Sequence, residues 1–287
     1  MQGGAQITFY GTRGSTPCSG PQYARYGGNT SCVSLHSGEE CFVFDLGTGV
    51  RAFGESLTAL GANEGFRATV LVSHLHWDHV QGLPFFHPLM TPGSHVDIHG
   101  PAQPEGALGA VFDQFMRQPF FPITVHELAG SVHFVDTATD DFPVGRAKVR
   151  SRWIRHTSPT LGYRVQLDDV SVAYVSDHGQ GCSDDADDYV PDDVLELADG
   201  VDLLIHDAQH SCGEFERKRH FGHSTVDYAV HVAREAGARR LALFHHCPTH
   251  SDREVDDLCA QARDEAEHSG IAEVFAAAEG CTVTLRP

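Results

Sequence analysis

Short apolar runs alternate with segments of helical periodicity along the whole chain, and no clean linker interrupts the alternation. Apolar runs bounded by turn residues predict buried strands, whereas apolar residues three or four positions apart predict helices. Strands alternating with helices indicate an α/β protein. The predicted strands cover residues 6–10, 32–36, 41–45, 68–72, 147–154, 163–166, 170–176, 201–206 and 240–244, and the predicted helices cover residues 50–60, 224–236 and 252–268.

Length and charge limit the classes of partner. With 287 residues and 41% hydrophobic content, the chain can bury a large core, and we expect a single domain over residues 1–287. The formal charge of −19, from 39 acidic against 20 basic residues, argues against broad contact with nucleic acid or acidic membranes. We therefore expect small partners, no large nucleic acid and no membrane, and homodimerisation is an option.

Eight cysteines are scattered without Cys-x-x-Cys spacing, which is typical of reduced thiols in a cytoplasmic protein. The first residues lack an export signal, and no apolar run reaches membrane length. Cys247 follows His245 by two positions, but we expect it to pack in the core rather than bind metal. The acidic stretch 183–188 lacks the glycine and final glutamate of a calcium loop, so we expect a solvated turn before a helix near Pro191.

The most specific chemical signal is the sequence SHLHWDH at residues 73–79. His74 and His76 follow a predicted strand, and residues two apart at a strand end point the same way, so both imidazoles can bind one metal ion. Asp78 and His79 follow in the turn and can bind a second ion. Imidazole with carboxylate suits zinc, iron or manganese, and catalytic sites leave a coordination position open for water.

The sequence of residues 74–79 resembles the HxHxDH signature of the metallo-β-lactamase-fold superfamily. Residues 155–164 resemble the His-(x)5-Gly-Tyr-Arg segment of ribonuclease Z and related phosphodiesterases, while Asp177 and His245 end strands as later metal ligands of that family do. The resemblance extends from Gly11 to Gly280. It implies an αββα sandwich and two divalent metal ions, with zinc expected and manganese or iron as alternatives.

The resemblance also implies a complete set of ligands. His74, His76 and His156 would bind the first ion, Asp78, His79 and His245 would bind the second, and Asp177 would bridge the two ions. Metal ions that share a carboxylate lower the pKa of water between them and so generate a nucleophile at neutral pH. Relatives usually have threonine after the bridging aspartate, whereas this chain has His178.

A further histidine lies outside the metal motif. Ser224 and Asp227 form a Ser-x-x-Asp pattern that predicts a helix cap, which would fix His223 just before a helix. Ribonuclease Z-like phosphodiesterases have a similar His-Ser-Thr segment and use its histidine in catalysis, and Asp207 resembles the acidic residue that orients it. We therefore expect Asp78, His223 and Asp207 to be the catalytic residues, with His223 contacting a phosphate oxygen or giving a proton to the leaving group.

The length of the segment between Arg164 and Asp177 limits the class of substrate. Only 12 residues separate Arg164 from Asp177, which leaves no room for the long arm that transfer-RNA-processing relatives have there. We therefore expect a phosphodiesterase for a small phosphodiester, such as a cyclic nucleotide or cyclic phosphate. A thioesterase or glyoxalase II-like hydrolase, an RNA-processing nuclease and a non-catalytic nucleotide sensor remain as alternatives.

Residues 85–128 are rich in phenylalanine and proline, and we expect them to cover the metal site. Asp45 lies in a turn that the resemblance places near the metals.

Overall fold

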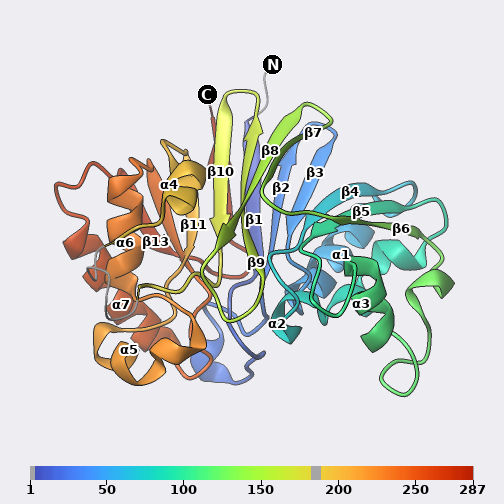
Figure 1. Cartoon of the computed structure of the whole chain (residues 1–287), viewed down its shortest axis with the longest axis horizontal. Coiled ribbons are helices and arrows are strands. Elements are labelled where there is room, and N and C mark those ends of the chain that lie inside the picture. Colours follow the sequence, from blue (N-terminus) through green and yellow to red (C-terminus); the bar gives the residue numbers. More distant parts are fainter. Residues whose placement is uncertain (1–3, 182–188, 287) are drawn as a thin grey trace.

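Two seven-stranded sheets packed face to face form the centre of the part of the chain that the computed structural model describes, residues 4–181 and 189–286 (Figure 1). The first sheet has the order β14 (Thr282–Leu285), β1 (Ala5–Gly11), β2 (Cys32–Ser37), β3 (Glu40–Phe44), β4 (Arg67–Leu71), β5 (His95–Gly100) and β6 (Ser131–Asp136). The second has the order β13 (Glu273–Ala276), β12 (Arg240–Phe244), β11 (Leu203–Asp207), β10 (Val170–Val175), β9 (Thr160–Leu167), β8 (Ala147–Ile154) and β7 (Asp140–Val144).

Helices cover the outer face of each sheet (Figure 1). The first sheet is covered by α1 (Gly49–Ala59) and α3 (Leu108–Phe115), and the second by α4 (Asp192–Ala198), α6 (Val226–Glu235) and α7 (Asp252–Glu265). Two short helices, α2 (Trp77–Val80) and α5 (Cys212–Lys218), lie at one edge of the sandwich. This arrangement confirms the αββα sandwich that the sequence predicted.

Apolar side chains form one layer between the sheets and one beneath the helices on each side. Strand β10 is buried along its whole length, because one face packs between the sheets and the other packs against helices. Its continuous apolar run therefore reflects burial on both faces. The rings of Phe44 and Tyr174 stack across the two sheets with centroids 5.0 Å apart.

The parallel strands determine where polar residues gather. Strands β3 to β6 are parallel to one another in the first sheet, and β10 to β13 are parallel in the second. Three non-glycine residues just after such strands have positive φ angles, namely Asp45 (59°), Asp177 (51°) and His245 (61°). Left-handed backbone at such residues costs roughly 1–3 kcal/mol each and is concentrated at functional sites. The strained strand ends therefore mark the edge where α2 and α5 lie.

Several elements were not predicted. Strands β5, β6, β7, β13 and β14 and helices α3 and α5 were missed. Strand β5 lies inside the segment expected to be a cover, so that expectation was wrong for its residues. In β5, His95, Asp97 and His99 alternate with two buried apolar residues, and this short pattern contains no apolar run. Phe86 and Phe112, from the same segment, are buried in the core.

The predicted cap of α6 was also displaced. Thr225, and not Ser224, is the N-cap residue, because its side chain accepts a hydrogen bond from the amide of Tyr228. The Ser224 hydroxyl instead donates to the carbonyl of His178. The acidic stretch 183–188 lies outside the described residues, and helix α4 after it begins at Asp192. Among the described residues, no helix has both the length and the apolar character needed to cross a membrane.

Candidate metal centre

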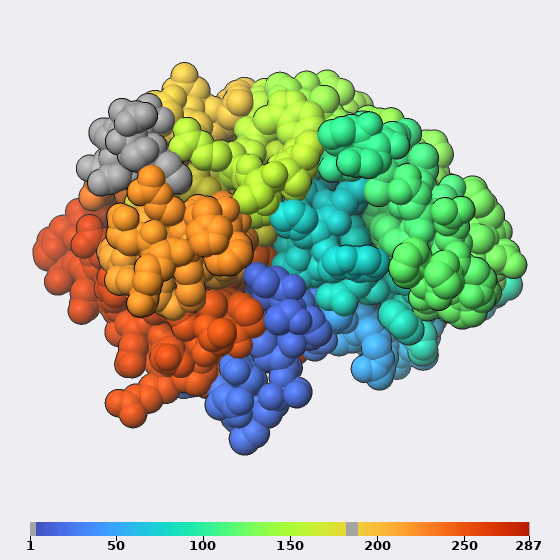
Figure 2. Space-filling model, turned by 60° about the horizontal axis from the view of Figure 1, so that its bottom comes forward, coloured from blue at the N-terminus to red at the C-terminus, as the bar shows by residue number. Residues whose placement is uncertain are grey.

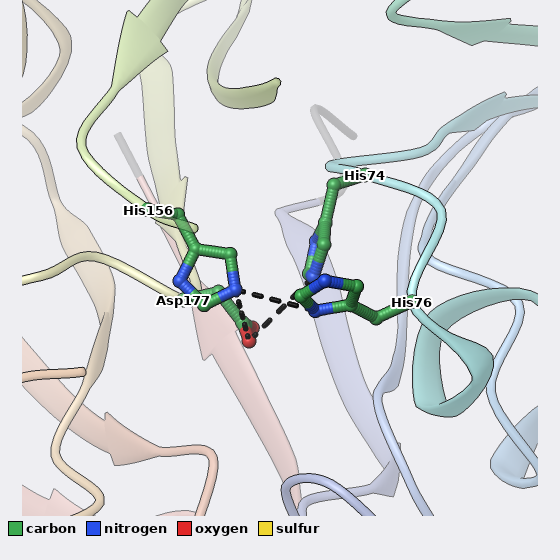
Figure 3. A group of neighbouring side chains, drawn as sticks. All are labelled: His74, His76, His156 and Asp177. Carbon is green, nitrogen blue, oxygen red and sulfur yellow. Dashed lines mark hydrogen bonds and ion pairs between the residues drawn. The ribbon is translucent and has the colours of Figure 1, made fainter. Parts of the chain in front are cut away.

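Three histidines and an aspartate from three strand ends meet at one point (Figure 3). His74 and His76 follow β4, His156 follows β8, and Asp177 follows β10. Nε2 of His156 lies 3.3 Å from Nδ1 of His76 and 3.7 Å from Oδ1 of Asp177. The same carboxylate oxygen lies 3.8 Å from Nε2 of His74. His76 is exposed, so this first group opens to solvent.

A second group shares Asp177 with the first. Oδ2 of Asp177 lies 3.1 Å from Nε2 of His79 and 3.2 Å from Nε2 of His245. Oδ2 of Asp78 lies 3.2 Å from each of the same two nitrogens. Asp177 therefore turns one oxygen toward each group, which is the geometry of a bridging carboxylate.

The donor atoms fit divalent cations. Ligands 2.0–2.1 Å from a tetrahedral zinc ion are about 3.3 Å from one another, close to the separations in the second group, while the first group is somewhat wider. Nε2 of His74 and Nε2 of His79 are buried and have no hydrogen-bond partner among the described residues. An unsatisfied buried polar atom costs about 1–3 kcal/mol, so these nitrogens are expected to have a partner that the protein itself does not supply.

Hydrogen bonds hold the ligand rings in place. Oδ2 of Asp45 accepts from Nδ1 of His79 at 2.7 Å, from the hydroxyl of Tyr174 at 2.7 Å and from that of Ser73 at 2.9 Å. Nδ1 of His156 lies 2.7 Å from the carbonyl of Gly222. Because a proton on Nδ1 leaves Nε2 free to bind metal, these partners select the binding tautomer. The resemblance places the turn of Asp45 near the metals, but only the fold shows that Asp45 orients the ring of His79.

His245 has two neighbours that sequence reasoning missed. Its Nδ1 lies 3.0 Å from the side-chain atom placed as Nε2 of Gln209. With a proton on Nδ1, this contact requires the Gln209 amide to present its oxygen, an assignment that depends on the hydrogen-bond network. Gly14 packs against the same ring, since a Cβ there would lie 2.5 Å from Cε1 of His245. The next residue, Ser15, donates its amide hydrogen to Oδ2 of Asp78 at 2.7 Å.

Charge in the cluster favours ionised carboxylates. Burial alone would raise the pKa of Asp177, but His245, His79 and His74 hold it well below its usual range. Burial would likewise raise the pKa of Asp78, yet His79 and His245 lower it. Burial, together with neighbouring rings, lowers the pKa of His74. Burial would lower the pKa of His79, but the carboxylates of Asp177, Asp78 and Asp45 raise it well above its ordinary value. A metal ion bound at Nε2 of His79 would therefore displace a proton, which makes metal affinity dependent on pH.

His223 and Asp207 form a hydrogen-bonded pair beside the cluster. Nδ1 of His223 donates to Oδ2 of Asp207 at 2.7 Å and lies 3.8 Å from Oδ1 of Asp177. Asp207 is fully buried, and its other oxygen accepts from the amides of Gln209 and Ser224. Burial would lower the pKa of His223, but Asp207 raises it above its usual value. At 2.7 Å the pair is too close to surround an ion, so we interpret it as a hydrogen bond.

The cluster lies in a cleft of about 700 Å³. Its lining comes from residues 75–78, 156–157, 209–210 and 247–249, together with Ser15, Asp177, Lys218, His220, Phe221 and His223. In Figure 2 this side of the molecule comes forward, with the orange segment around α5 beside the cyan segment around α2. The segment expected as a cover reaches the rim at Trp77, whose ring centroid lies 5.5 Å from that of Phe115. A covering role for the rest of that segment stays a prediction.

Comparison with known proteins gives the family. A family model described as the beta-lactamase superfamily domain matches residues 43–246, which contain every proposed ligand. The chain belongs to the beta-lactamase superfamily. The ribonuclease Z of Haloarcula marismortui is 26% identical to it, over 90% of this chain and 91% of that protein.

Solved structures agree on the fold. The metallo-β-lactamase fold protein YhfI from Bacillus subtilis has a TM-score of 0.70 and 18% identity, covering 98% of this chain and 99% of its own. A diphosphatase of the PhnP family has a TM-score of 0.68 and 19% identity, with 98% of both chains covered. Together with the histidine and aspartate cluster, these relationships make this superfamily member a metal-dependent hydrolase.

Two residues next to proposed ligands have other surroundings. The ring of His178 packs against His206 and Tyr228, and burial lowers the pKa of His178 well below its ordinary value. The thiol of Cys247 is buried and lies 3.1 Å from the hydroxyl of Thr249, and Cys247 lines the cleft rather than the apolar core. All seven cysteines among the described residues are free thiols.

Proposed function

We propose that this hydrolase is a phosphodiesterase for a small phosphodiester, and that it uses two divalent metal ions, zinc being the first choice. The His223 and Asp207 pair beside the shared Asp177 carries the proposal. A phosphodiester releases an alkoxide, which needs a proton as it leaves, whereas a thiolate leaves readily without one. A histidine held by a buried carboxylate next to the centre therefore favours phosphodiester over thioester hydrolysis.

The chain's own residues would act as follows. The two groups that share Asp177 would each hold one ion, and when bound, the ions would supply Lewis acidity and lower the pKa of water at the site. Asp207 fixes Nδ1 of His223, so that Nε2 faces the cleft. The raised pKa of His223 keeps a proton available for the leaving oxygen, and the carboxylate of Asp207 stabilises the charged ring. Asp45 keeps His79 in its binding tautomer.

The substrate is proposed to be small because of the connection between β9 and β10. Leu167 pairs with Val170, so a two-residue turn, Asp168 and Asp169, joins the strands. Any arm at this position would have to replace that turn. A cleft of about 700 Å³ is in the size range of sites for small molecules. The net charge of −19 also disfavours extended contact with RNA.

RNA processing is a second candidate, because the relatives that match over most of the chain are called ribonuclease Z. The match with the Haloarcula protein runs over 305 positions, whereas this chain has 287 residues, so that protein contains residues without a counterpart here. A precursor transfer RNA should therefore be included among the substrates tested. Cleavage of that RNA at a rate above that for cyclic nucleotides would favour the second candidate.

The proposal is tested by metal analysis followed by a substrate panel. The panel contains bis(p-nitrophenyl) phosphate, 2′,3′- and 3′,5′-cyclic nucleotides and a thioester. His223→Ala is expected to retain the metal content but to lose roughly 10²- to 10⁴-fold in turnover of the natural-type diesters. The matched control is His126→Ala, because the His126 side chain is 80% exposed and lies outside the cleft.

Three results would contradict the proposal. Metal-loaded protein that hydrolyses the thioester but no diester would indicate a thioesterase. Nucleotide binding without any hydrolysis would indicate a sensor. Unchanged diester turnover in the His223→Ala variant would remove His223 from the mechanism.

A further inference from the structure

One buried histidine of the cleft wall has no role in the proposed chemistry. His210 is 1% exposed, lines the cleft, and has both ring nitrogens without a hydrogen-bond partner among the described residues. Its ring centroid lies 5.8 Å from that of His223, at a nearly perpendicular angle. Leaving a buried polar group unpaired is costly, so a ring in this position is expected to hydrogen-bond to a ligand in the cleft.

A lysine lines the same cleft. Nζ of Lys218 donates to Oε1 of Glu214 at 2.8 Å and lies 3.8 Å from Sγ of Cys247. An ammonium group has three N–H donors, so these contacts leave one for a ligand. The carboxylate of Glu214 is also bound by His250 and lies outside the cleft lining. Lys218 therefore presents a positive charge to the cleft on a protein whose net charge is −19.

The two carboxylates of the cleft lining are already in use. Asp78 and Asp177 line it, but both belong to the proposed metal groups. His223 is next to His210, and the proposed mechanism places the leaving oxygen at His223. A ligand group held by His210 and Lys218 would thus be attached to the departing half of the substrate.

We infer that His210 and Lys218 form a second anion subsite, which binds a phosphate carried by the leaving group of the substrate. The inference rests on the proposed phosphodiesterase function and narrows its substrate class. The imidazole N–H and the ammonium N–H donate to phosphate oxygens, and no bond is made or broken there. Two aromatic rings on the rim, Trp77 and Phe221, are 60% and 55% exposed and could stack on a base. The favoured substrate is therefore a nucleotide phosphodiester with an additional phosphate.

Binding of a probe without a phosphodiester bond tests the subsite directly. Adenosine 3′,5′-bisphosphate contains two phosphate monoesters, so a phosphodiesterase does not consume it, and adenosine 5′-monophosphate is the comparison ligand. Isothermal titration calorimetry of the metal-loaded protein is expected to show about 10- to 100-fold tighter binding of the bisphosphate. Lys218→Met and His210→Phe should abolish most of this difference.

Conservative variants separate a binding role from a folding role. Lys218→Arg keeps the charge and His210→Asn keeps a donor, so each should recover part of the preference. Lys148→Met is the matched control, since Lys148 is exposed on β8 and outside this cleft. Equal affinity of the wild type for both ligands, or an unchanged preference in Lys218→Met, would overturn the subsite.

Kinetics distinguish failure of the subsite from failure of the proposed function. The kcat/KM of the wild type is compared for a diadenosine monophosphate diester with and without an added terminal phosphate at either end. A preference for one phosphorylated form that Lys218→Met removes supports the subsite. Hydrolysis of bis(p-nitrophenyl) phosphate without any preference between the phosphorylated forms would refute the subsite but leave the phosphodiesterase proposal standing. Absence of hydrolysis of every diester would refute the phosphodiesterase proposal itself.

Discussion

Replacing Gly14 with alanine tests whether His245 must occupy its position to bind metal. A Cβ at residue 14 would lie 2.5 Å from Cε1 and 2.6 Å from Nδ1 of His245, and 2.5 Å from Nε2 of Gln209. The φ angle of Gly14 is not in the left-handed region, so alanine can adopt its backbone conformation. The backbone cannot easily retreat, because the amide of Gly14 donates to the carbonyl of His246 at 3.0 Å.

The size of the effect follows from these distances. Ordinary contact with a Cβ begins at 3.4 Å, so the ring of His245 would have to move by about 0.9 Å. Metal ligands tolerate deviations of about 0.2 Å, and disturbing the support of a ligand ring typically costs about 10- to 100-fold in metal affinity. A displacement near 1 Å in the catalytic centre costs on the order of 100-fold in rate. We therefore expect Gly14→Ala to lose metal from the second group and about 100-fold in kcat.

The assay combines metal titration with turnover. Zinc affinity is measured by competition with a chromophoric chelator, and kcat is measured with bis(p-nitrophenyl) phosphate. Gly213→Ala is the matched control, because Gly213 also has a φ outside the left-handed region and an added Cβ there would meet nothing within 4 Å. Wild-type zinc affinity and turnover in Gly14→Ala would refute the reasoning, since His245 would then be free to bind metal from a displaced position or would not bind it at all.

Three further predictions follow from the same contacts. Removing the metals with a chelator should abolish turnover and lower Tm by about 10 °C, because a ligand present at 1,000 times its Kd stabilises the folded state by about 4 kcal/mol. Restoring zinc should reverse both changes. An unchanged Tm would argue against buried metal sites. Asp207→Asn should lower kcat by roughly 10²- to 10⁴-fold with metal content retained, because His223 loses the neighbouring charge that raises its pKa. Loss of metal from this variant would instead indicate that Asp207 is a metal ligand. Glu214→Gln should lower the free energy of unfolding at pH 7 by about 1–3 kcal/mol. Burial would raise the pKa of Glu214, but Lys218 and neighbouring donors lower it. The stabilisation by ionised Glu214 is therefore present above the ordinary carboxyl pKa and should shrink progressively as the pH falls below that value, which urea titrations at several pH values would measure. A difference in unfolding free energy between wild type and Glu214→Gln that is independent of pH would contradict the ionised hydrogen bond.

The elements that the sequence predicted correctly are those with a strong local pattern. Strand β10 is apolar throughout because both its faces are buried, and α7 shows one apolar stripe and ends three residues before the predicted limit. Strands β5 and β6 were missed because polar and apolar residues are interspersed in both, so neither contains an apolar run longer than two residues. The two terminal strands β13 and β14 have only four residues each, too few for periodicity to be recognised.

The candidate site divides in the same way. His74, His76, Asp78 and His79 lie within six residues of one another, so their spacing after a predicted strand was enough to indicate metal binding. The remaining proposed ligands, far apart in the chain, could be assigned only by resemblance, and the fold brings them to the same point because carboxyl ends of parallel strands share one edge. No local pattern distinguished His210, which became notable only through its burial without a partner.

By itself, the sequence determined the α/β class and the presence of a metal motif, because both depend on patterns within short stretches of the chain. Only the tertiary structure decided that Asp177 turns one oxygen to each group of ligands, that Asp45 holds His79, and that Gly14 leaves room for His245. Each of these contacts would be lost if the residues moved by a few tenths of an ångström to 1 Å. The residues lie far apart along the chain, so the packing of the two sheets sets the distances between them.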